Sequence, residues 1–287
     1  TLGVDANRAS TMAFSSDRGL LGHVYSAKEP ITVCDVSKDE RFEGFPYSVT
    51  RILVVPLVAE GSVIGLIVAN DKTNGEEYFT TEIKLVHSIA SECATSIKKA
   101  LLYEEVNSML FSTAESFSLA MDAKDPYTYG HSKRVSEISA AIAREMGFSA
   151  ETVGWIRLAA LLHDIGKIGT PENILHKDER LSDDEMARIK DHPVIGAKMI
   201  EHVYRMKEIA RWLCHHHERY DGKGYPSGLT GEDIPVPSRI IAIADYYDAL
   251  TTDRPYRKAY DRQKAVEMMR DILGKHLDPV IFEHFVK

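Results

Sequence analysis

The sequence predicts an α+β domain with an antiparallel sheet, joined by a long helix to an all-α helical bundle. Three observations carry this prediction. The apolar run at residues 52–69 is broken by a polar turn at residues 60–62, a pattern typical of two buried strands joined as a hairpin. Residues 80–125 contain no Gly or Pro, which favours a long helix. After that stretch, apolar residues recur mainly with helical spacing.

The bulk composition fits a globular protein of two domains. A chain of 287 residues is long for one domain, and 44% hydrophobic with 27% charged residues is ordinary. The net charge of -8 argues against a duplex nucleic-acid surface, although a local basic pocket for a small anion is compatible with it. Pro56 and the polar turn make residues 52–69 a poor membrane span, so we expect none in this chain.

The cysteines predict a reducing, cytoplasmic location. Cys34, Cys93 and Cys214 are odd in number and widely spaced, so they form neither a disulfide framework nor a CxxC zinc site. We expect no signal peptide. The sequence begins at Thr1 without an initiator Met, which fits a fragment or a processed chain with upstream segments that are not visible here.

Short elements are expected in the first hundred residues, followed by the long helix. A short helix is predicted near residues 19–24 and a strand at residues 30–35, ahead of the hairpin. Beyond Thr80, spacings of four, three, four and three predict a coiled-coil-like seam of Val86, Ala90, Cys93, Ile97 and Ala100. Further apolar positions are Val106, Met109, Leu110 and Phe117. Two interpretations stay open: a continuous connecting helix that also dimerises, or one helix that packs on its own domain and is followed by another.

The first hundred residues resemble a GAF domain. The resemblance rests on GLLGHVYSAKEPITVCDV, VVPLVAEGSVIGLIVAND and FTTEIKLVHSIASECATSI. It implies an input module that senses a small molecule or dimerises, and it names no ligand. Asn70, Lys72, Phe79 and Glu82 loosely resemble a motif of cyclic-nucleotide-binding members, but packing at a strand end and a helix start explains them equally well, and we favour that structural explanation.

Several helices are predicted after Asp125. Residues 135–146 are amphipathic and stop at Gly147, and residues 151–165 form an apolar helix. Ser182 with Glu185 is a capping box that opens a helix at residues 183–190. Pro193 begins the next helix, and residues 239–250 form another.

The stretch LAALLHDIGK at residues 158–167 places a polar pair at the end of the apolar helix. Burying His163 and Asp164 costs several kcal/mol unless each finds a partner, and a metal ion satisfies both. His163 can hold one ion, while the two oxygens of Asp164 can bridge it to a second ion roughly 3.5–4 Å away. For the isolated pair, a buried His–Asp hydrogen bond is the favoured alternative.

Four further places supply ligand-type residues. His131 opens a helix, His192 lies at a joint between two helices, and Asp245 follows an apolar run as Asp164 does. His216 and His217 belong to a run of imidazoles that is hard to explain as a solvated face. Each alone has an ordinary structural explanation, but together these imidazoles and carboxylates match the nitrogen and oxygen ligand set of a two-metal site.

In this order, and with HDIGK and HHERYDGKGYP intact, these residues resemble the HD-GYP family of cyclic di-GMP phosphodiesterases, a branch of the HD-domain metal-dependent phosphohydrolases. The resemblance covers residues 123–287, after a GAF-like domain at 1–100 and a connecting helix at 101–122. It implies an HD-type helical bundle whose metal ligands are His131, His163, Asp164, His192, His216, His217 and Asp245.

The resemblance also implies roles around the metals. Asp164 and Lys167 are expected to be catalytic, with Lys167 facing the substrate phosphate. Gly224, Tyr225 and Pro226 would shape the substrate pocket, and Arg254 and Arg257 would grip phosphate. His215 is extra to the motif and is expected behind the ligands or at the surface. Tyr127 stands where three-metal members have Glu, so we expect two metals.

The resemblance implies hydrolysis of cyclic di-GMP to pGpG, with GMP as a further product, under control of the GAF-like domain. Iron or manganese is expected, because mixed imidazole and carboxylate ligands with open positions suit both. A homodimer through residues 79–121 is expected. The alternatives are a phosphodiesterase for another cyclic dinucleotide and a binding or signalling module that has lost catalysis.

Overall fold

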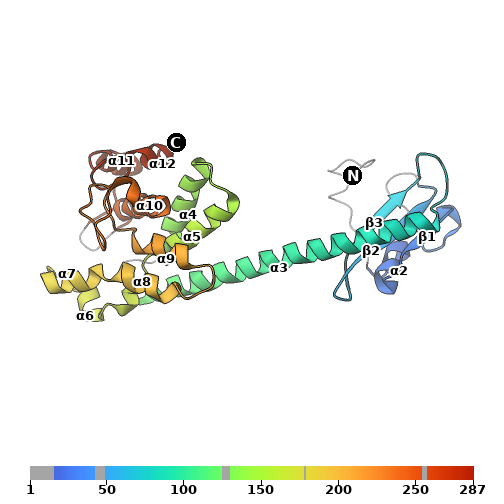
Figure 1. Ribbon diagram of the computed structural model, residues 1–287, viewed down its shortest axis with the longest axis horizontal. Helices are drawn as coiled ribbons and strands as arrows, with labels where there is room; N and C mark the ends of the chain where they lie inside the picture. The colour runs from blue at the N-terminus through green and yellow to red at the C-terminus, as the bar shows by residue number, and fades with distance from the viewer. Residues whose placement is uncertain (1–15, 43–48, 125–129, 178, 254–256) are drawn as a thin grey trace. The chain divides into compact units, whose positions relative to one another are not determined.

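The computed structural model describes residues 16–42, 49–124, 130–177, 179–253 and 257–287. It divides the chain into two compact units, Thr1–Asn107 and Ser108–Lys287, whose elements are labelled in Figure 1. Between the sequence-predicted boundaries at residues 100 and 122, the chain is a single helix. No helix in the described ranges combines the length and apolar character needed to cross a membrane.

The first unit is built on a three-stranded antiparallel sheet with strand order β1-β2-β3. The strands are β1 Ile31–Val33, β2 Ile52–Ala59 and β3 Ser62–Asn70, and helix α2 Gly19–Ala27 and 3-10 helix η1 Val36–Lys38 flank β1. The predicted hairpin is therefore confirmed. Its tight turn has positive φ at both Glu60 and Gly61, the backbone that joins twisted strands without splaying them.

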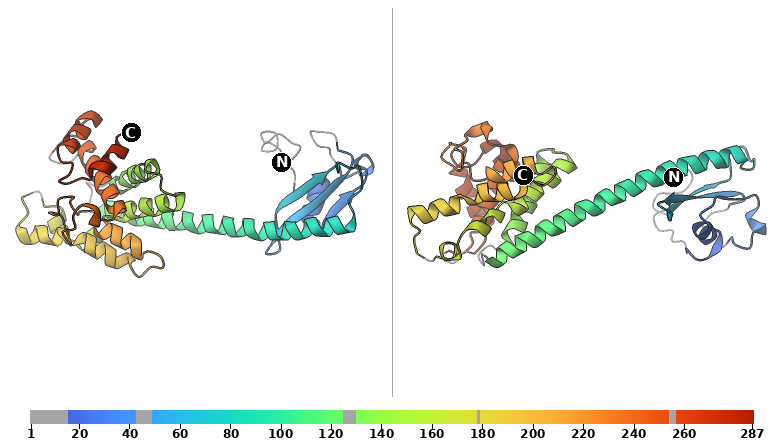
Figure 2. Two further views of the ribbon diagram at one scale, coloured as in Figure 1. Left: turned by 45° about the horizontal axis from the view of Figure 1, so that its top comes forward. Right: turned by 60° about the horizontal axis from the view of Figure 1, so that its bottom comes forward.

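Strand β2 is apolar along its length because both faces of the sheet are covered. Its residues Ile52 and Val54 pack with α2, whereas Leu53 and Val55 pack with helix α3 Thr80–Lys124. Figure 2 shows α2 and the first part of α3 on opposite faces of the sheet. A strand buried on both sides carries a continuous hydrophobic run rather than an alternating one.

Contacts at the start of α3 agree with the structural explanation of the residues that resemble a cyclic-nucleotide-binding motif. The Nζ of Lys72 lies 2.8 Å from Oε1 of Glu82, and Oε2 of Glu82 accepts a hydrogen bond from the backbone N–H of Phe79. These groups therefore partner one another where β3 leads into the helix.

Helix α3 is continuous over 45 residues, as the connecting-helix interpretation expects. The predicted single seam along it is wrong. Ala90 and Ala94 are buried against the sheet, while Cys93 and Ile97 are exposed. The seam residues divide between two environments because the sheet occupies one side of the helix.

The second unit is helical. Helices α4 His131–Glu145, α5 Ala150–Leu162 and α10 Val236–Thr251 contribute to two hydrophobic cores. One core includes α8 His192–Ile200, α9 Lys207–Cys214 and the end of α3; the other includes α11 Arg262–Arg270 and α12 Pro279–Phe285. The remaining elements are α6 Glu172–Leu175, α7 Asp183–Lys190 and the 3-10 helices η3 Ile165–Gly169 and η4 Gly231–Asp233.

Local signals fix where several of these helices begin. The predicted capping box opens α7: the Ser182 side chain accepts from the Glu185 N–H, and the Glu185 carboxylate accepts from the Ser182 N–H. The predicted helix at residues 151–165 ends at Leu162 instead. At Gly166 in η3, a β-carbon would overlap the backbone of His192 and Gly196 in α8, so only glycine permits this close packing.

Candidate metal centre

The fold brings six of the seven predicted ligands into two overlapping clusters of side chains, and the seventh, Asp245, lies beside His131 of one cluster. Most of them stand at the ends of elements. His131 is the first residue of α4, His163 and Asp164 lie between α5 and η3, and His192 opens α8. The remaining three are His216 and His217, which begin two residues after the end of α9, and Asp245 within α10. Helix ends placed by the two cores can aim side chains from distant parts of the chain at one point.

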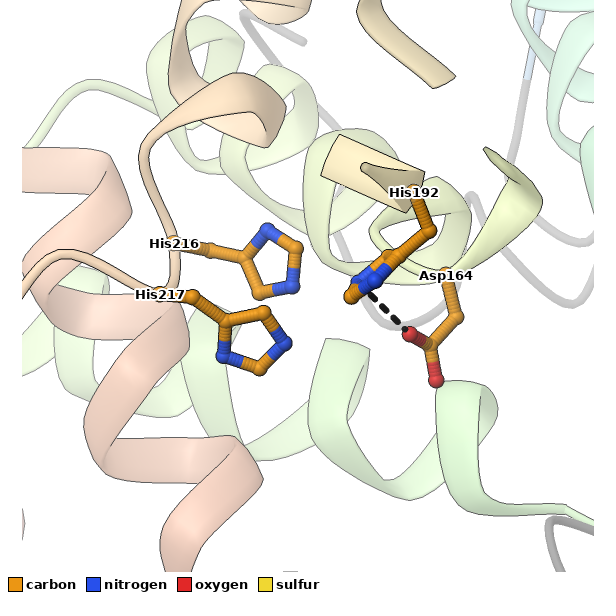
Figure 3. A group of neighbouring side chains, drawn as sticks. All are labelled: Asp164, His192, His216 and His217. Carbon is orange, nitrogen blue, oxygen red and sulfur yellow. Dashed lines mark ion pairs between the residues drawn. The ribbon is translucent and has the colours of Figure 1, made fainter. Parts of the chain in front are cut away.

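Asp164 is the residue that the two clusters share. One potential metal-binding group consists of Asp164, His192, His216 and His217, and the other of His131, His163 and Asp164. Figure 3 shows the first group, with the imidazoles and the carboxylate facing a common centre. Oδ1 of Asp164 lies 3.3 Å from Nε2 of His192, while Oδ2 lies 3.4 Å from Nε2 of His163. The two carboxylate oxygens therefore face different sets of imidazoles.

Three of the imidazoles are oriented by the carbonyl of the residue three positions earlier. Nδ1 of His163 lies 2.7 Å from the Ala160 carbonyl, Nδ1 of His192 lies 2.7 Å from that of Ile189, and Nδ1 of His216 lies 2.6 Å from that of Leu213. A carbonyl only accepts, so Nδ1 carries the proton and Nε2 keeps its lone pair. This is the arrangement that prepares an imidazole to bind a metal.

Two of the Nε2 atoms provide a direct test of whether metal fits. Nε2 of His192 and Nε2 of His216 are buried and have no hydrogen-bond partner among the described residues. A buried polar atom without a partner costs about 1–3 kcal/mol. A metal ion would satisfy both atoms, so the residues present fit the predicted metals.

His131 is held on both sides by carboxylates. Its Nε2 lies 3.3 Å from Oδ1 of Asp245, and its Nδ1 lies 2.7 Å from Oδ2 of Asp248. Burial alone would lower the pKa of His131, but these carboxylates raise it to about 10. Asp248 also accepts hydrogen bonds from Arg134. Our sequence analysis missed Asp248; the available signal was its position one helical turn after Asp245.

The electrostatics favour neutral imidazoles at His192, His216 and His217, beside ionised carboxylates. Burial lowers the pKa of His217 to about 4, and it also lowers the pKa values of His192 and His216. Burial opposes ionisation of Asp164 and Asp245, yet neighbouring cationic groups, Lys167 for Asp164 and His131 for Asp245, lower both pKa values. Neutral imidazole nitrogen and carboxylate oxygen form a donor set suited to iron, manganese or zinc.

Lys167 lies within the cluster. It belongs to η3, and its Nζ is 2.7 Å from Oδ2 of Asp164. Its ammonium group therefore already stands beside the shared carboxylate. Contact with a substrate phosphate stays a prediction.

The predicted pocket residues adjoin the centre. The rings of Tyr225 and His217 have centroids 5.0 Å apart. A β-carbon on Gly224 would overlap the backbone of Glu218 and Arg219, so this position requires glycine. The buried Glu218 carboxylate accepts hydrogen bonds from two backbone N–H groups after Pro226, at Ser227 and Leu229. Glu218, which our sequence analysis did not single out, holds this loop beside the predicted ligand His217.

Other predicted residues are placed elsewhere or lie outside the described ranges. The Arg257 guanidinium donates to the carbonyls of Ala249 and Leu250 at the end of α10 and stacks on Tyr260, so phosphate contact stays a prediction. Half-buried His215 lies behind the ligands, with Nδ1 3.4 Å from Glu218. Arg254 and Tyr127 fall outside the described residues.

Comparison with known proteins finds a family match for each of the two parts of the chain. The HD domain family matches residues 115–281, and the GAF domain family matches residues 3–97. The 3'3'-cGAMP-specific phosphodiesterase 3 of Vibrio cholerae is 41% identical over 58% of this chain and 36% of the relative. A cyclic di-GMP phosphodiesterase of Pseudomonas aeruginosa is 41% identical over 58% and 40%, respectively.

A cyclic di-GMP phosphodiesterase of Thermotoga maritima is 34% identical over 71% of this chain and 58% of the relative. The chain therefore spans between 36% and 58% of the length of these relatives. The predicted order, a GAF-like domain followed by an HD-type domain, is confirmed. Because the HD match covers more than half of the chain, this protein belongs to the HD domain family and carries a GAF domain ahead of its HD domain.

Proposed function

We propose that this protein hydrolyses a phosphodiester bond of a cyclic dinucleotide, with cyclic di-GMP as the substrate and pGpG and then GMP as the products. The observation that carries the proposal is Asp164, whose two oxygens face two different sets of imidazoles. A carboxylate in this position can bridge two metal ions, the arrangement used in two-metal phosphodiester hydrolysis.

Each cluster has a defined part in this proposal. His192, His216, His217 and Asp164 would hold one ion, and His131, His163, Asp164 and the nearby Asp245 the other. Two divalent ions, iron or manganese, would supply a nucleophile at neutral pH and neutralise charge on the phosphoryl oxygens. Asp164 would help to hold both ions. Lys167, whose ammonium group lies at the shared carboxylate, would bind a phosphoryl oxygen as negative charge develops on it.

A hybrid substrate is the second candidate. Its support is the 41% identity to the 3'3'-cGAMP-specific phosphodiesterase of Vibrio cholerae, which equals the identity to the Pseudomonas cyclic di-GMP enzyme. A module without catalysis is the third candidate, and the complete ligand set argues against it.

The experiment combines metal counting with product analysis. The chain is purified without oxygen, its metals are counted, and products from cyclic di-GMP and 3'3'-cGAMP are separated by chromatography. We expect two metal ions per chain and linear dinucleotide product. Asp164→Ala should lose bound metal and should form no product. Asp271→Ala, at an exposed carboxylate, should behave as wild type. Full turnover by Asp164→Ala in metal-replete buffer would refute the bridging role.

The same proposal includes a homodimer formed through α3, with the GAF domain controlling turnover in the cytoplasm. The dimer is supported by large apolar side chains on α3 that are exposed: Leu85, Ile89, Ile97, Leu101, Leu102, Tyr103, Val106, Met109, Phe117 and Leu119. A second copy packed along this helix would remove these apolar side chains from water. Light scattering tests the mass, and a monomer at micromolar concentration would refute the dimer.

A further inference from the structure

We propose that Lys190 binds the phosphate of the cyclic dinucleotide that is not being cleaved. The inference rests on the proposed function and adds to it a substrate-binding residue. Lys190 is the last residue of α7, two positions before the ligand His192. It lies outside HDIGK, the GYP segment and the seven ligands.

The position of Lys190 is defined by contact with an aromatic ring at the metal centre. Its Nζ lies 5.5 Å from the centroid of the Tyr225 ring. That ring in turn lies 5.0 Å from the ring of His217, and His217 lies 5.0 Å from His192. The ammonium group is therefore separated from a metal ligand by one aromatic ring. Because Lys190 itself is exposed, an incoming substrate can reach it.

The ammonium group of Lys190 has no carboxylate partner in the part of the chain that the structure describes. Among the described residues, no carboxylate lies within ion-pair distance of its Nζ, whereas Lys177 of the same region is paired with Glu185 and Lys167 with Asp164. An ammonium over an aromatic face keeps donors directed away from the ring. Those donors can bind an anion without first breaking an ion pair.

The substrate carries a second phosphate that a second cationic site can bind. A cyclic dinucleotide carries two phosphodiesters in one ring, so when one lies at the metals and Lys167, the other lies one nucleotide away. The ammonium group of Lys190, which the Tyr225 ring separates from His217, is placed to bind that second phosphate. Lysine binds phosphate as a point charge, through hydrogen bonds strengthened by that charge.

The test compares two substrates in the metal-loaded protein. Cyclic di-GMP has two phosphodiesters, whereas bis(p-nitrophenyl) phosphate has one and cannot reach a second site. We expect Lys190→Ala to raise the KM for cyclic di-GMP about tenfold, the order of one charge-assisted hydrogen bond, with kcat and metal content largely retained. The rise in KM for bis(p-nitrophenyl) phosphate should be several times smaller. Lys190→Arg should recover most of the affinity for cyclic di-GMP.

Lys198→Ala is the matched control, because Lys198 is an exposed lysine in the last turn of the neighbouring helix α8. It should match wild type with both substrates. An unchanged KM for cyclic di-GMP in Lys190→Ala, equal losses with both substrates, or equal losses in the two alanine variants would overturn the role of Lys190. If wild type cleaves neither cyclic di-GMP nor 3'3'-cGAMP, the proposed function fails, and this inference fails with it.

Discussion

Asp248→Asn should weaken one of the two metal sites and spare the other. The carboxylate of Asp248 is buried and accepts a hydrogen bond from Nδ1 of His131 at 2.7 Å, which leaves Nε2 of His131 directed at Asp245. It also accepts from Nε of Arg134 at 2.6 Å. Asparagine keeps the size of the side chain but replaces one acceptor oxygen with an NH₂ donor.

With Arg134 donating to the remaining oxygen, that NH₂ group faces Nδ1 of His131. The imidazole then accepts at Nδ1 and carries its proton on Nε2, the atom needed for metal. Loss of such a supporting partner costs about 10- to 100-fold in metal affinity, or about 1.4–2.7 kcal/mol. The cluster of His192, His216 and His217 makes no contact with Asp248 in the described structure, so its affinity should stay as in wild type.

Manganese titration against a fluorescent chelator measures both binding steps. We expect one step to weaken by about 10- to 100-fold and the other to stay unchanged in Asp248→Asn. Asp271→Asn, at an exposed position, is the control, and thermal unfolding of the metal-free proteins checks the fold. Two unchanged steps would refute the reasoning; equal weakening of both would show that the clusters do not act as separate sites.

Three further predictions concern catalysis and stability. Lys167→Ala should lower kcat by about 100-fold or more, as loss of one electrostatic stabiliser does, with metal content retained; loss of metal would instead assign Lys167 to the ligand environment. Gly166→Ala should destabilise the HD domain by about 1–3 kcal/mol in urea unfolding, because its β-carbon would overlap the α8 backbone. Gly154→Ala, in the interior of α5 with open space around the β-carbon, should be neutral or stabilising, and equal losses in both would contradict the packing argument. Glu185→Gln should lower the Tm at pH 7, because hydrogen bonds from Lys177 and Ser182 lower the pKa of Glu185 to about 2. Since that pKa is depressed in the folded state, its contribution is complete above the ordinary value of 4.5 and declines as pH falls toward 2; a Tm difference that persists undiminished at pH 3 would be the contrary result.

Several features could be predicted from the sequence because local pattern encodes them. The hairpin of β2 and β3 follows from an apolar run broken by a turn, and α7 follows from Ser182 and Glu185. Candidate ligands could be identified because imidazoles and carboxylates at the ends of apolar helices require partners after burial. These signals lie within one element and depend on its own periodicity.

Other features depended on how the elements pack. The predicted seam on α3 failed because the sheet covers Ala90 and Ala94 but leaves Ile97 exposed. Asp248 was missed because its partner His131 is 117 residues away in sequence. The spacing of residues along a helix fixes the face on which each side chain lies, but not which other helix meets that face.

The sequence alone thus determined the fold class and named the candidate ligands. Tertiary structure decided that the two oxygens of Asp164 face different imidazoles, that Asp248 supports His131, and that the ammonium of Lys190 lies over Tyr225. The physical reason is that ligand geometry depends on distances of a few ångströms between elements far apart in the chain. Those distances are set by the joint packing of the two helical cores. No single segment of the sequence contains the information that determines this packing.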